Sequence, residues 1–170
     1  LVSKYQQRVV NLVSRYIKGS EAQDVAQEAF VKAWRALDGF KGNSAFYTWL
    51  YRIAINTAKN YLVARSRRPA QQDIDVADAE LYGHTEALSD TSSPEALLEG
   101  EEVKRVILQA IAELPAELKT AIMLRELDGM SYEEIAISME CPVGTVRSRI
   151  FRARANITET LADFGTLTSI

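Results

Sequence analysis

The sequence predicts an all-α protein in which two small helical domains are joined by a flexible acidic linker. Apolar residues recur at three- and four-residue intervals through most of the chain, which is the spacing of one helix face. Serine caps and glycine or proline stops divide this pattern into separate helices. The net charge changes along the chain, from +8 over residues 1–68 to −10 over 69–102 and −1 over 103–170. The acidity therefore belongs mostly to a segment between two folded parts.

These patterns set the expected boundaries. We expect a first domain over residues 1–68, a linker over 69–93, a second domain over 94–164 and a tail over 165–170. In the linker the apolar periodicity fades, acids dominate, and Gly, Ser, Thr and Pro collect. Such a composition favours an extended, self-repelling tether.

Composition limits the kinds of protein this chain can be. The 170 residues are 47% apolar and 25% charged, with no run long enough to cross a membrane. The single cysteine, Cys141, excludes an internal disulfide and fits a reducing compartment, so we expect a cytoplasmic protein. With His84 as the only histidine, a Cys/His zinc site is untenable, and no carboxylate spacing indicates another metal. We expect no metal, no cofactor and no small-molecule substrate, and a natural N-terminus upstream of Leu1.

Three helices are expected in the first domain, over residues 1–17, 20–37 and 44–64. Ser20 and Gln23 have the spacing of a capping box, and Ser44 is the expected cap of the third helix. The second helix should turn one apolar stripe inward, formed by Ala26, Phe30, Ala33 and Leu37.

The third helix carries two different stripes. Its core-facing residues are expected to be Phe46, Leu50, Ile53, Thr57 and Tyr61. A second, outward stripe consists of Trp49, Arg52, Asn56 and Lys59. Aromatic faces stack on unpaired bases, amides read base edges and cations follow the backbone, so the second stripe indicates binding to single-stranded DNA. Ordinary core packing is the alternative reading of an aromatic-rich helix, and we accept it for Phe46, Leu50 and Tyr61.

The second domain is expected to begin with helices over residues 94–114 and 116–127. Ser93 caps the first of them, and Pro94 opens it at the position where proline is favoured. Gly129 ends the second.

A helix-turn-helix is expected next. Ser131 and Glu134 have the spacing of a capping box, and Pro142 breaks the pattern because proline is tolerated only in the first turn of a helix. The following helix has one apolar stripe, formed by Val146, Ile150, Ala153 and Ile157. The chain from Leu161 onward is expected to be a frayed end.

The last helix is unusually basic on its outer side. It carries four arginines within eight residues and no acid at helical spacing to neutralise them: Arg147, Arg149, Arg152 and Arg154. A solvated helical hairpin is the alternative, since charged faces are common on surface helices. The unpaired charge favours an external polyanion, and a short helix with small polar residues at its start suits the major groove of DNA.

Four stretches of the chain closely resemble the extracytoplasmic-function sigma factors of bacterial RNA polymerase, most of all their envelope-stress, sigma-E-like branch. They are DVAQEAFVKAWRAL (24–37), FKGNSAFYTWLYRIAINTAKNYL (40–62), LPAELKTAIMLRELDGMSYEEIA (114–136) and CPVGTVRSRIFRAR (141–154). They follow one another in the family's order and cover nearly the whole chain. The linker and the family's opening helix, which would precede Leu1, are the parts not matched.

The resemblance implies three interaction surfaces. The surface for the polymerase clamp helices corresponds to Asp24, Gln27, Glu28, Lys32 and Trp34. Recognition and melting of the −10 element corresponds to the loop residues Phe40, Lys41, Asn43, Ser44 and Phe46 together with Trp49, Arg52, Asn56 and Lys59. Recognition of the −35 element corresponds to Arg147, Ser148 and Arg152 nearest the bases, and to Arg125, Tyr132, Thr145 and Phe151 at the backbone or thymine methyl groups.

These surfaces imply a non-enzymatic initiation factor with no catalytic residues. Its expected partners are bacterial core RNA polymerase, the −35 duplex, the −10 single strand and an anti-sigma factor tethered to the membrane, and its expected targets are stress promoters. A stand-alone helix-turn-helix regulator is an alternative, although it leaves the third helix without a purpose. A DNA-processing enzyme such as a recombinase is another, but the acids that its chemistry needs gather in the linker.

Overall fold

The computed structural model describes residues 2–67 and 94–168, and every regular element in these ranges is helical. The elements are α1 (Val2–Ser14), α2 (Glu21–Ala36), the short 3-10 helix η1 (Leu37–Gly39), α3 (Phe46–Ser66), α4 (Pro94–Glu113), α5 (Ala116–Glu126), α6 (Tyr132–Met139) and α7 (Val143–Thr168). The all-α prediction is confirmed. The predicted linker over 69–93, which includes His84 and Ser93, lies outside the described residues.

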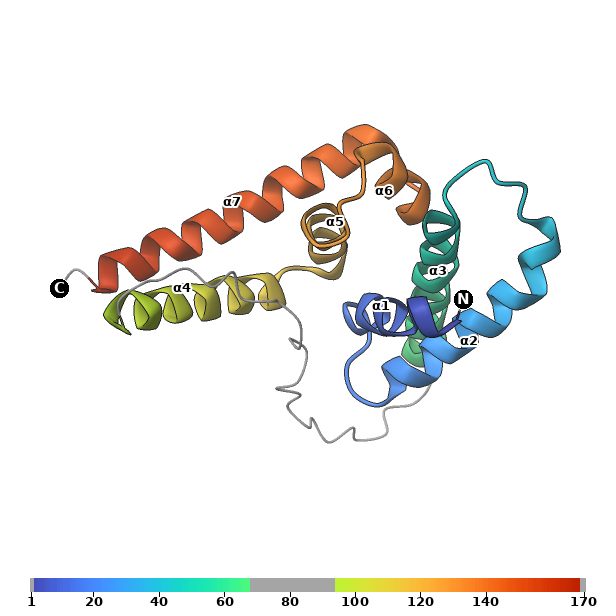
Figure 1. Cartoon of the computed structure of the whole chain (residues 1–170), viewed down its shortest axis with the longest axis horizontal. Coiled ribbons are helices and arrows are strands. Elements are labelled where there is room, and N and C mark those ends of the chain that lie inside the picture. Colours follow the sequence, from blue (N-terminus) through green and yellow to red (C-terminus); the bar gives the residue numbers. More distant parts are fainter. Residues whose placement is uncertain (1, 68–93, 169–170) are drawn as a thin grey trace.

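Two groups of helices meet where α3 packs against α6 (Figure 1). The N-terminal unit consists of α1, α2 and α3, which pack on one another. The C-terminal unit consists of α4 to α7, and its helices α4 and α7 run side by side as a long pair. The buried apolar residues of both units form one continuous cluster. The two units therefore share a packed contact in addition to their own cores.

α2 packs through small side chains. Its buried residues are Ala22, Val25, Ala26, Ala29 and Ala33. The predicted inward stripe was right for Ala26 and Ala33, whereas Phe30 is half-buried and Leu37 is 39% exposed in η1. The small alanine side chains allow α1 and α3 to approach α2 closely. The predicted stripe also included the larger residues Phe30 and Leu37, which lie to one side of this contact.

α3 is enclosed on more than one side, because it contacts α1 and α2 as well as α6. Its buried residues are Thr48, Trp49, Leu50, Tyr51, Ala54, Ile55, Thr57 and Ala58. The prediction of a single core-facing stripe was therefore incomplete. Leu50 and Thr57 are buried as expected, but Ile53 and Tyr61 are only half-buried, and Trp49 is buried instead of pointing outward.

Capping was predicted correctly at one serine and wrongly at two. Ser131 has an extended backbone (φ −69°, ψ 161°) and forms the full reciprocal box with Glu134. Ser20 already has a helical backbone (φ −63°, ψ −22°), and its side chain caps no N–H in the described structure. α3 begins after Ala45 rather than Ser44, again with no side-chain cap among the described residues. A serine side chain reaches the N–H three residues on only from an extended backbone, which sequence spacing does not reveal.

α7 is longer than predicted. The helix continues to Thr168, although a frayed end was expected from Leu161 onward. Ile157 and Leu161 are half-buried, and α4 packs along this part of the unit. Packing against α4 thus stabilises the C-terminal part of α7, where the sequence itself gives no clear helix stop.

Ser131→Ala is expected to lower the free energy of unfolding by about 1 kcal/mol, because it removes the acceptor for the Glu134 N–H at the start of α6. Urea unfolding followed by circular dichroism measures this loss. Ser20→Ala is the matched control and should change the free energy of unfolding by less than about 0.5 kcal/mol. Equal losses at the two serines would show that the cap at Ser131 contributes nothing of its own.

Candidate nucleic-acid interfaces

Local backbone geometry builds the turn before α7. Glu140, which has a left-handed backbone (φ 51°), caps the C-terminal end of α6, and its N–H bonds back to carbonyls of that helix. The N–H of Cys141 bonds to the Ala136 carbonyl at 3.1 Å. The apolar side of α7 is almost fully buried at Val146, Ile150 and Ala153. The helix-turn-helix prediction is thus met by a tight turn that fixes which side of α7 faces solvent.

The outer side of α7 carries the residues predicted to read the −35 element. They recur at three- and four-residue spacing along one side of the helix: Thr145, Arg147, Ser148, Phe151 and Arg152. Four of them are exposed, and the fifth, Thr145, is half-buried. Phe151 is 74% exposed, although a large apolar side chain usually avoids water. This side therefore offers hydroxyl, cationic and apolar groups to an external partner.

Tyr132, at the start of α6, connects this surface to α5. Its ring lies 5.0 Å from the Arg125 guanidinium and 6.0 Å from that of Arg147. Arg125 also donates to the Met130 carbonyl at 2.8 Å. Arg125 is therefore held in place by the turn, and the Tyr132 ring attracts both guanidinium groups.

Two of the four arginines on α7 are neutralised by α5. Arg149 lies 3.0 Å from the Glu117 carboxylate, and Arg154 lies 2.7 Å from that of Glu126. The sequence argument missed these pairs because it considered only acids at helical spacing. The other two arginines have no ion pair within residues 2–67 and 94–168, so they provide the unneutralised charge of the outer side.

Aromatic side chains gather where the loop before α3 meets the helix. Ring centroids are 5.0 Å apart for Phe40 and Trp49, and 5.6 Å apart for Phe46 and Trp49. Trp49 is only 8% exposed, so the prediction that it points outward was wrong. Packed rings bury a large apolar area, and this contact anchors the loop to α3. The other predicted loop residues lie at or near the surface: Lys41, Asn43 and Ser44.

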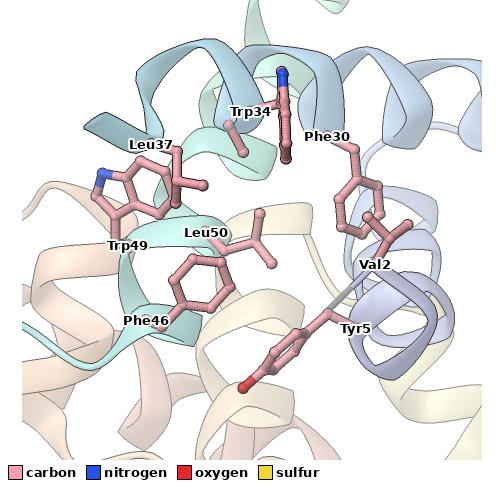
Figure 2. Close-up of a pocket in the computed structure, with 9 residues that line it drawn as sticks. Val2, Tyr5, Phe30, Trp34, Leu37, Phe46, Trp49 and Leu50 are labelled. Carbon is pink, nitrogen blue, oxygen red and sulfur yellow. The ribbon is translucent and has the colours of Figure 1, made fainter. Parts of the chain in front are cut away.

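An apolar pocket opens beside this cluster, between α1, α2 and α3 (Figure 2). Most of its wall is aromatic, from Tyr5, Phe30, Trp34, Phe46 and Trp49. Trp34 belongs to this wall although its side chain is 77% exposed. Sequence reasoning did not find the pocket, because periodicity describes one helix at a time and three helices line it.

The polar stripe of α3, which we define as Arg52, Asn56 and Lys59, faces the C-terminal unit. Lys59 Nζ lies 2.8 Å from the Glu117 carboxylate of α5, and Arg52 Nε lies 3.9 Å from that of Glu140. All three stripe residues are half-buried. The stripe predicted as an open surface is therefore partly covered in this arrangement.

Further polar contacts join the units beyond this stripe. The Ser138 hydroxyl donates to the Thr48 carbonyl at 2.9 Å, and both residues are fully buried. The Tyr47 hydroxyl donates to the Glu134 carboxylate at 2.5 Å. Asp128, between α5 and α6, accepts from Tyr51 at 3.5 Å, and burial raises the pKa of Tyr51 to about 12. None of these contacts was predicted, because each joins residues far apart in the chain.

The residues predicted to bind polymerase lie along the outer side of α2. All five are exposed: Asp24, Gln27, Glu28, Lys32 and Trp34. Glu28 and Lys32 form an ion pair of 2.9 Å one helical turn apart. Charged and amide groups around a protruding indole are typical of a protein-binding surface.

In residues 2–67 and 94–168 no group of three or more His, Cys, Asp or Glu side chains is placed to hold a metal ion. No helix in these ranges is long and apolar enough to cross a bilayer.

Two family patterns match the sequence, sigma-70 region 2 over residues 1–68 and sigma-70 region 4 over residues 104–157. The chain is also 59% identical over 157 residues to the ECF RNA polymerase sigma-E factor of Escherichia coli strain K12. This alignment covers 92% of this chain and 82% of that protein. The chain belongs to the extracytoplasmic-function family of RNA polymerase sigma factors. Within this sigma factor, the region 2 match includes α1 to α3, and the region 4 match runs from within α4 to within α7.

Two solved structures resemble the sigma factor. The sigma factor RpoE of Bartonella quintana, in complex with the anti-sigma factor NepR, aligns with a TM-score of 0.68 at 23% identity, over 95% of this chain and 94% of that one. CnrH, in complex with the cytosolic domain of CnrY, aligns with a TM-score of 0.60 at 26% identity, over 95% of this chain and 85% of that one. The fold is therefore shared across large sequence divergence.

Tyr47→Phe is expected to raise the pKa of Glu134 in the sigma factor. The hydrogen bond from Tyr47 is the main reason that the pKa of this carboxyl lies below its usual value, and the N–H of Ser131 contributes next. A carbon-detected NMR titration of the Glu134 carboxyl measures the change. Tyr51→Phe, whose hydroxyl lies near Asp128 instead, is the matched control.

The same contact predicts a pH dependence of stability. Because the folded pKa of Glu134 is below its unfolded value, the stabilisation is present above the usual glutamate pKa and is lost as the pH falls through the folded pKa. Tyr47→Phe should therefore reduce the loss of stability on the acid side. An unchanged pKa of Glu134 in this variant would contradict the contact between α3 and α6.

Proposed function

We propose that this sigma factor binds bacterial core RNA polymerase in the cytoplasm and directs it to recognise and open promoters of envelope-stress or extracytoplasmic-stress genes. It acts as an initiation subunit with no catalytic residues, no cofactor and no small-molecule substrate. Residues 1–68 serve polymerase binding and the −10 element, and residues 94–164 serve the −35 element. The observation that supports the proposal is that one chain of this family carries an exposed cationic side on α7, a polar stripe on α3 and an exposed polar-aromatic side on α2.

The −35 element is read by the outer side of α7. Arg147, Ser148 and Arg152 reach base edges in the major groove, where arginine bonds best to guanine. Phe151 is placed to contact thymine methyl groups, and Thr145 and Tyr132 to contact the backbone. Arg125 lies against the Tyr132 ring and adds positive charge near the phosphates.

The −10 element is opened by the loop before α3 and by the polar stripe. A base leaving the stack costs a few kcal/mol, so it needs a shaped pocket and stacking partners to stay out. Phe40, Lys41, Asn43, Ser44 and Phe46 form that pocket. Trp49 supports this pocket through its contacts with the rings of Phe40 and Phe46. Arg52, Asn56 and Lys59 bind the DNA strand next to the flipped base.

The outer side of α2 binds the clamp helices of polymerase. Trp34 is the apolar anchor, and Asp24, Gln27, Glu28 and Lys32 form the polar surroundings. An interface of this kind concentrates its binding energy in a buried aromatic residue, while the charged rim adds specificity.

An anti-sigma factor holds the protein inactive until stress releases it. CnrH, which shares the fold at 26% identity, is bound by the cytosolic domain of CnrY in its structure. A partner with a cytosolic domain fits a membrane-tethered inhibitor that receives a signal from outside the cytoplasm.

In vitro transcription with core polymerase tests the proposed function. On a template with stress-type −35 and −10 elements, added protein should give a defined transcript and permanganate-reactive thymines at the −10 element. Tight duplex binding without polymerase, and no transcript with it, would favour a stand-alone regulator instead.

Arg147→Ala is expected to cost about 1–3 kcal/mol of promoter binding and to reduce discrimination at one −35 position, because it removes a base contact in the major groove. Holoenzyme binding to a set of singly substituted −35 sequences measures this. Arg105→Ala, on the exposed side of α4, is the control and should leave discrimination unchanged. An equal loss on every sequence would show that Arg147 contacts only phosphate.

Trp34→Ala and Asn56→Ala are expected to separate two steps. Trp34→Ala should weaken binding to core polymerase by about 2 kcal/mol or more, as loss of an interface anchor does. Asn56→Ala should leave that affinity unchanged and reduce permanganate reactivity at the −10 element. Fluorescence titration with core polymerase measures the first step, and footprinting the second. Loss of polymerase binding in Asn56→Ala would mean that the surfaces are assigned to the wrong helices.

A further inference from the structure

Three helices of the C-terminal unit meet at the ring of Tyr132. The ring belongs to the first residue of α6, and the guanidinium groups that lie over it come from α5 and α7. The ring centroid is 5.0 Å from the Cζ atom of Arg125 and 6.0 Å from that of Arg147. A role for this ring in DNA recognition rests on the proposed function, in which Arg147 reads a −35 base.

The Tyr132 ring is a fixed support and not a mobile surface side chain. Ser131, directly before it, has an extended backbone and exchanges two hydrogen bonds with Glu134, which fixes the first turn of α6. Tyr132 is half-buried, and its side chain packs against the buried apolar residues of the fold. A ring that is restrained in this way has little conformational freedom left to lose when a cation rests against it.

Two of the arginines near this ring are each held by a contact of their own. Arg125 donates to the Met130 carbonyl at 2.8 Å, and Arg154 donates to the Glu126 carboxylate at 2.7 Å. The hydrogen bond to Glu126 is the main reason that the pKa of Arg154 is raised, and Tyr132 adds a smaller increase. Both arginines therefore keep their positions without help from the ring.

Arg147 lacks such an anchor. In residues 2–67 and 94–168 neither a hydrogen bond nor an ion pair holds its guanidinium, which lies over the Tyr132 ring. A free arginine side chain has many rotamers, so fixing it on a base costs conformational entropy. A ring that already holds the guanidinium lowers this cost, because the group is preorganised before DNA arrives.

The ring face and the hydroxyl of Tyr132 would contribute to DNA binding in different ways. The hydroxyl can bond a phosphate oxygen whatever the sequence, which adds affinity without discrimination between bases. The ring face attracts a guanidinium, and an arginine that is held over a ring can read the acceptors of a base edge. A contribution of the ring face should therefore appear in base discrimination, and a contribution of the hydroxyl only in overall affinity.

We propose that Tyr132 is a positioning residue for −35 recognition, whose ring face holds the Arg147 guanidinium in the orientation in which it bonds a base edge. Tyr132 acts through Arg147, and its hydroxyl is not needed for this role. Arg125, which lies against the same ring, connects the ring to α5. The sequence preference of α7 thus depends on a residue of the helix before it.

Tyr132→Leu and Tyr132→Phe separate these contributions in the full chain assembled with core polymerase. Tyr132→Leu removes the ring and keeps an apolar side chain, whereas Tyr132→Phe keeps the ring and removes the hydroxyl. Holoenzyme binding is measured on a promoter with a stress-type −35 element and on promoters with single substitutions in it. Discrimination is the ratio of two affinities of the same variant, so a partial loss of folded protein cancels from it.

Tyr132→Leu should reduce discrimination at the position read by Arg147 by about two- to fivefold, the contribution of one exposed cation–π contact. Discrimination at the other −35 positions should stay the same. Tyr132→Phe should keep the discrimination of the parent, with any loss of affinity equal on every sequence. Equal loss of discrimination in the two variants would overturn the proposal, because the hydroxyl would then be responsible.

A double-substitution cycle tests whether Tyr132 acts through Arg147. In an Arg147→Ala background, Tyr132→Leu should cause no further loss of discrimination, because the side chain that the ring positions is gone. Arg152→Ala is the matched background, since Arg152 is also exposed on α7 and lies over no aromatic ring in the described parts of the chain. There Tyr132→Leu should have its full effect. An effect of the same size in both backgrounds would show that Tyr132 acts independently of Arg147, and the proposal would fail.

The free protein gives a readout that needs no DNA. Nitrogen-15 relaxation of the Arg147 Nε–H reports the mobility of the guanidinium, which Tyr132→Leu should increase and Tyr132→Phe should leave at the parent level. Unchanged mobility in Tyr132→Leu would contradict the positioning role. The parent holoenzyme separates the two claims. If it shows no −35 discrimination, the proposed function falls and this role falls with it, whereas normal discrimination that Tyr132→Leu does not affect removes only this inference.

Discussion

The enclosure of α3 between two sets of helices governs the rest of this structure. α1 and α2 hold one part of its circumference, and α6 holds another through the Ser138–Thr48 hydrogen bond and the apolar residues around it. Over residues 48–58 of α3, more than half of the side chains are buried, so this part of the helix has a structural partner on several sides. The aromatic loop, the polar stripe and the position of the helix-turn-helix all follow from how α3 is covered.

Charge is distributed so that the two surfaces proposed to bind DNA differ in their ion pairing. On α7, the arginines beside α5 are neutralised by Glu117 and Glu126, while the cations of the outer side have no ion pair among the residues that the structure describes. On α3, the cations of the stripe are paired across the units. Glu117 takes part in both arrangements, because its carboxylate lies near Lys59 and near Arg149. One residue thus links the packing of α7 on α5 to the contact between the two units.

The sequence was sufficient for features that depend on neighbours within one helix. The apolar side of α7, the exposed residues of α2 and the capping box at Ser131 all repeat at helical spacing. The prediction that Trp49 points outward was wrong because helical spacing does not show whether a side of the helix faces water or packs against other rings. Trp49 has the same spacing from Arg52 in both cases. The Ser20 cap failed for a related reason, since hydrogen bonding there depends on backbone angles set by the preceding turn. Contacts between units are invisible to periodicity, because it contains no information on which helices meet.

The fit between α3 and α6 also bears on how tightly this protein can hold any partner that needs the two units apart. When only a fraction of molecules has the binding-competent arrangement, the apparent dissociation constant rises by the inverse of that fraction. A ten-to-one preference for the packed form would weaken the binding of such a partner about tenfold. The strength of one helix contact would then set the concentration that such a partner must reach before it is bound.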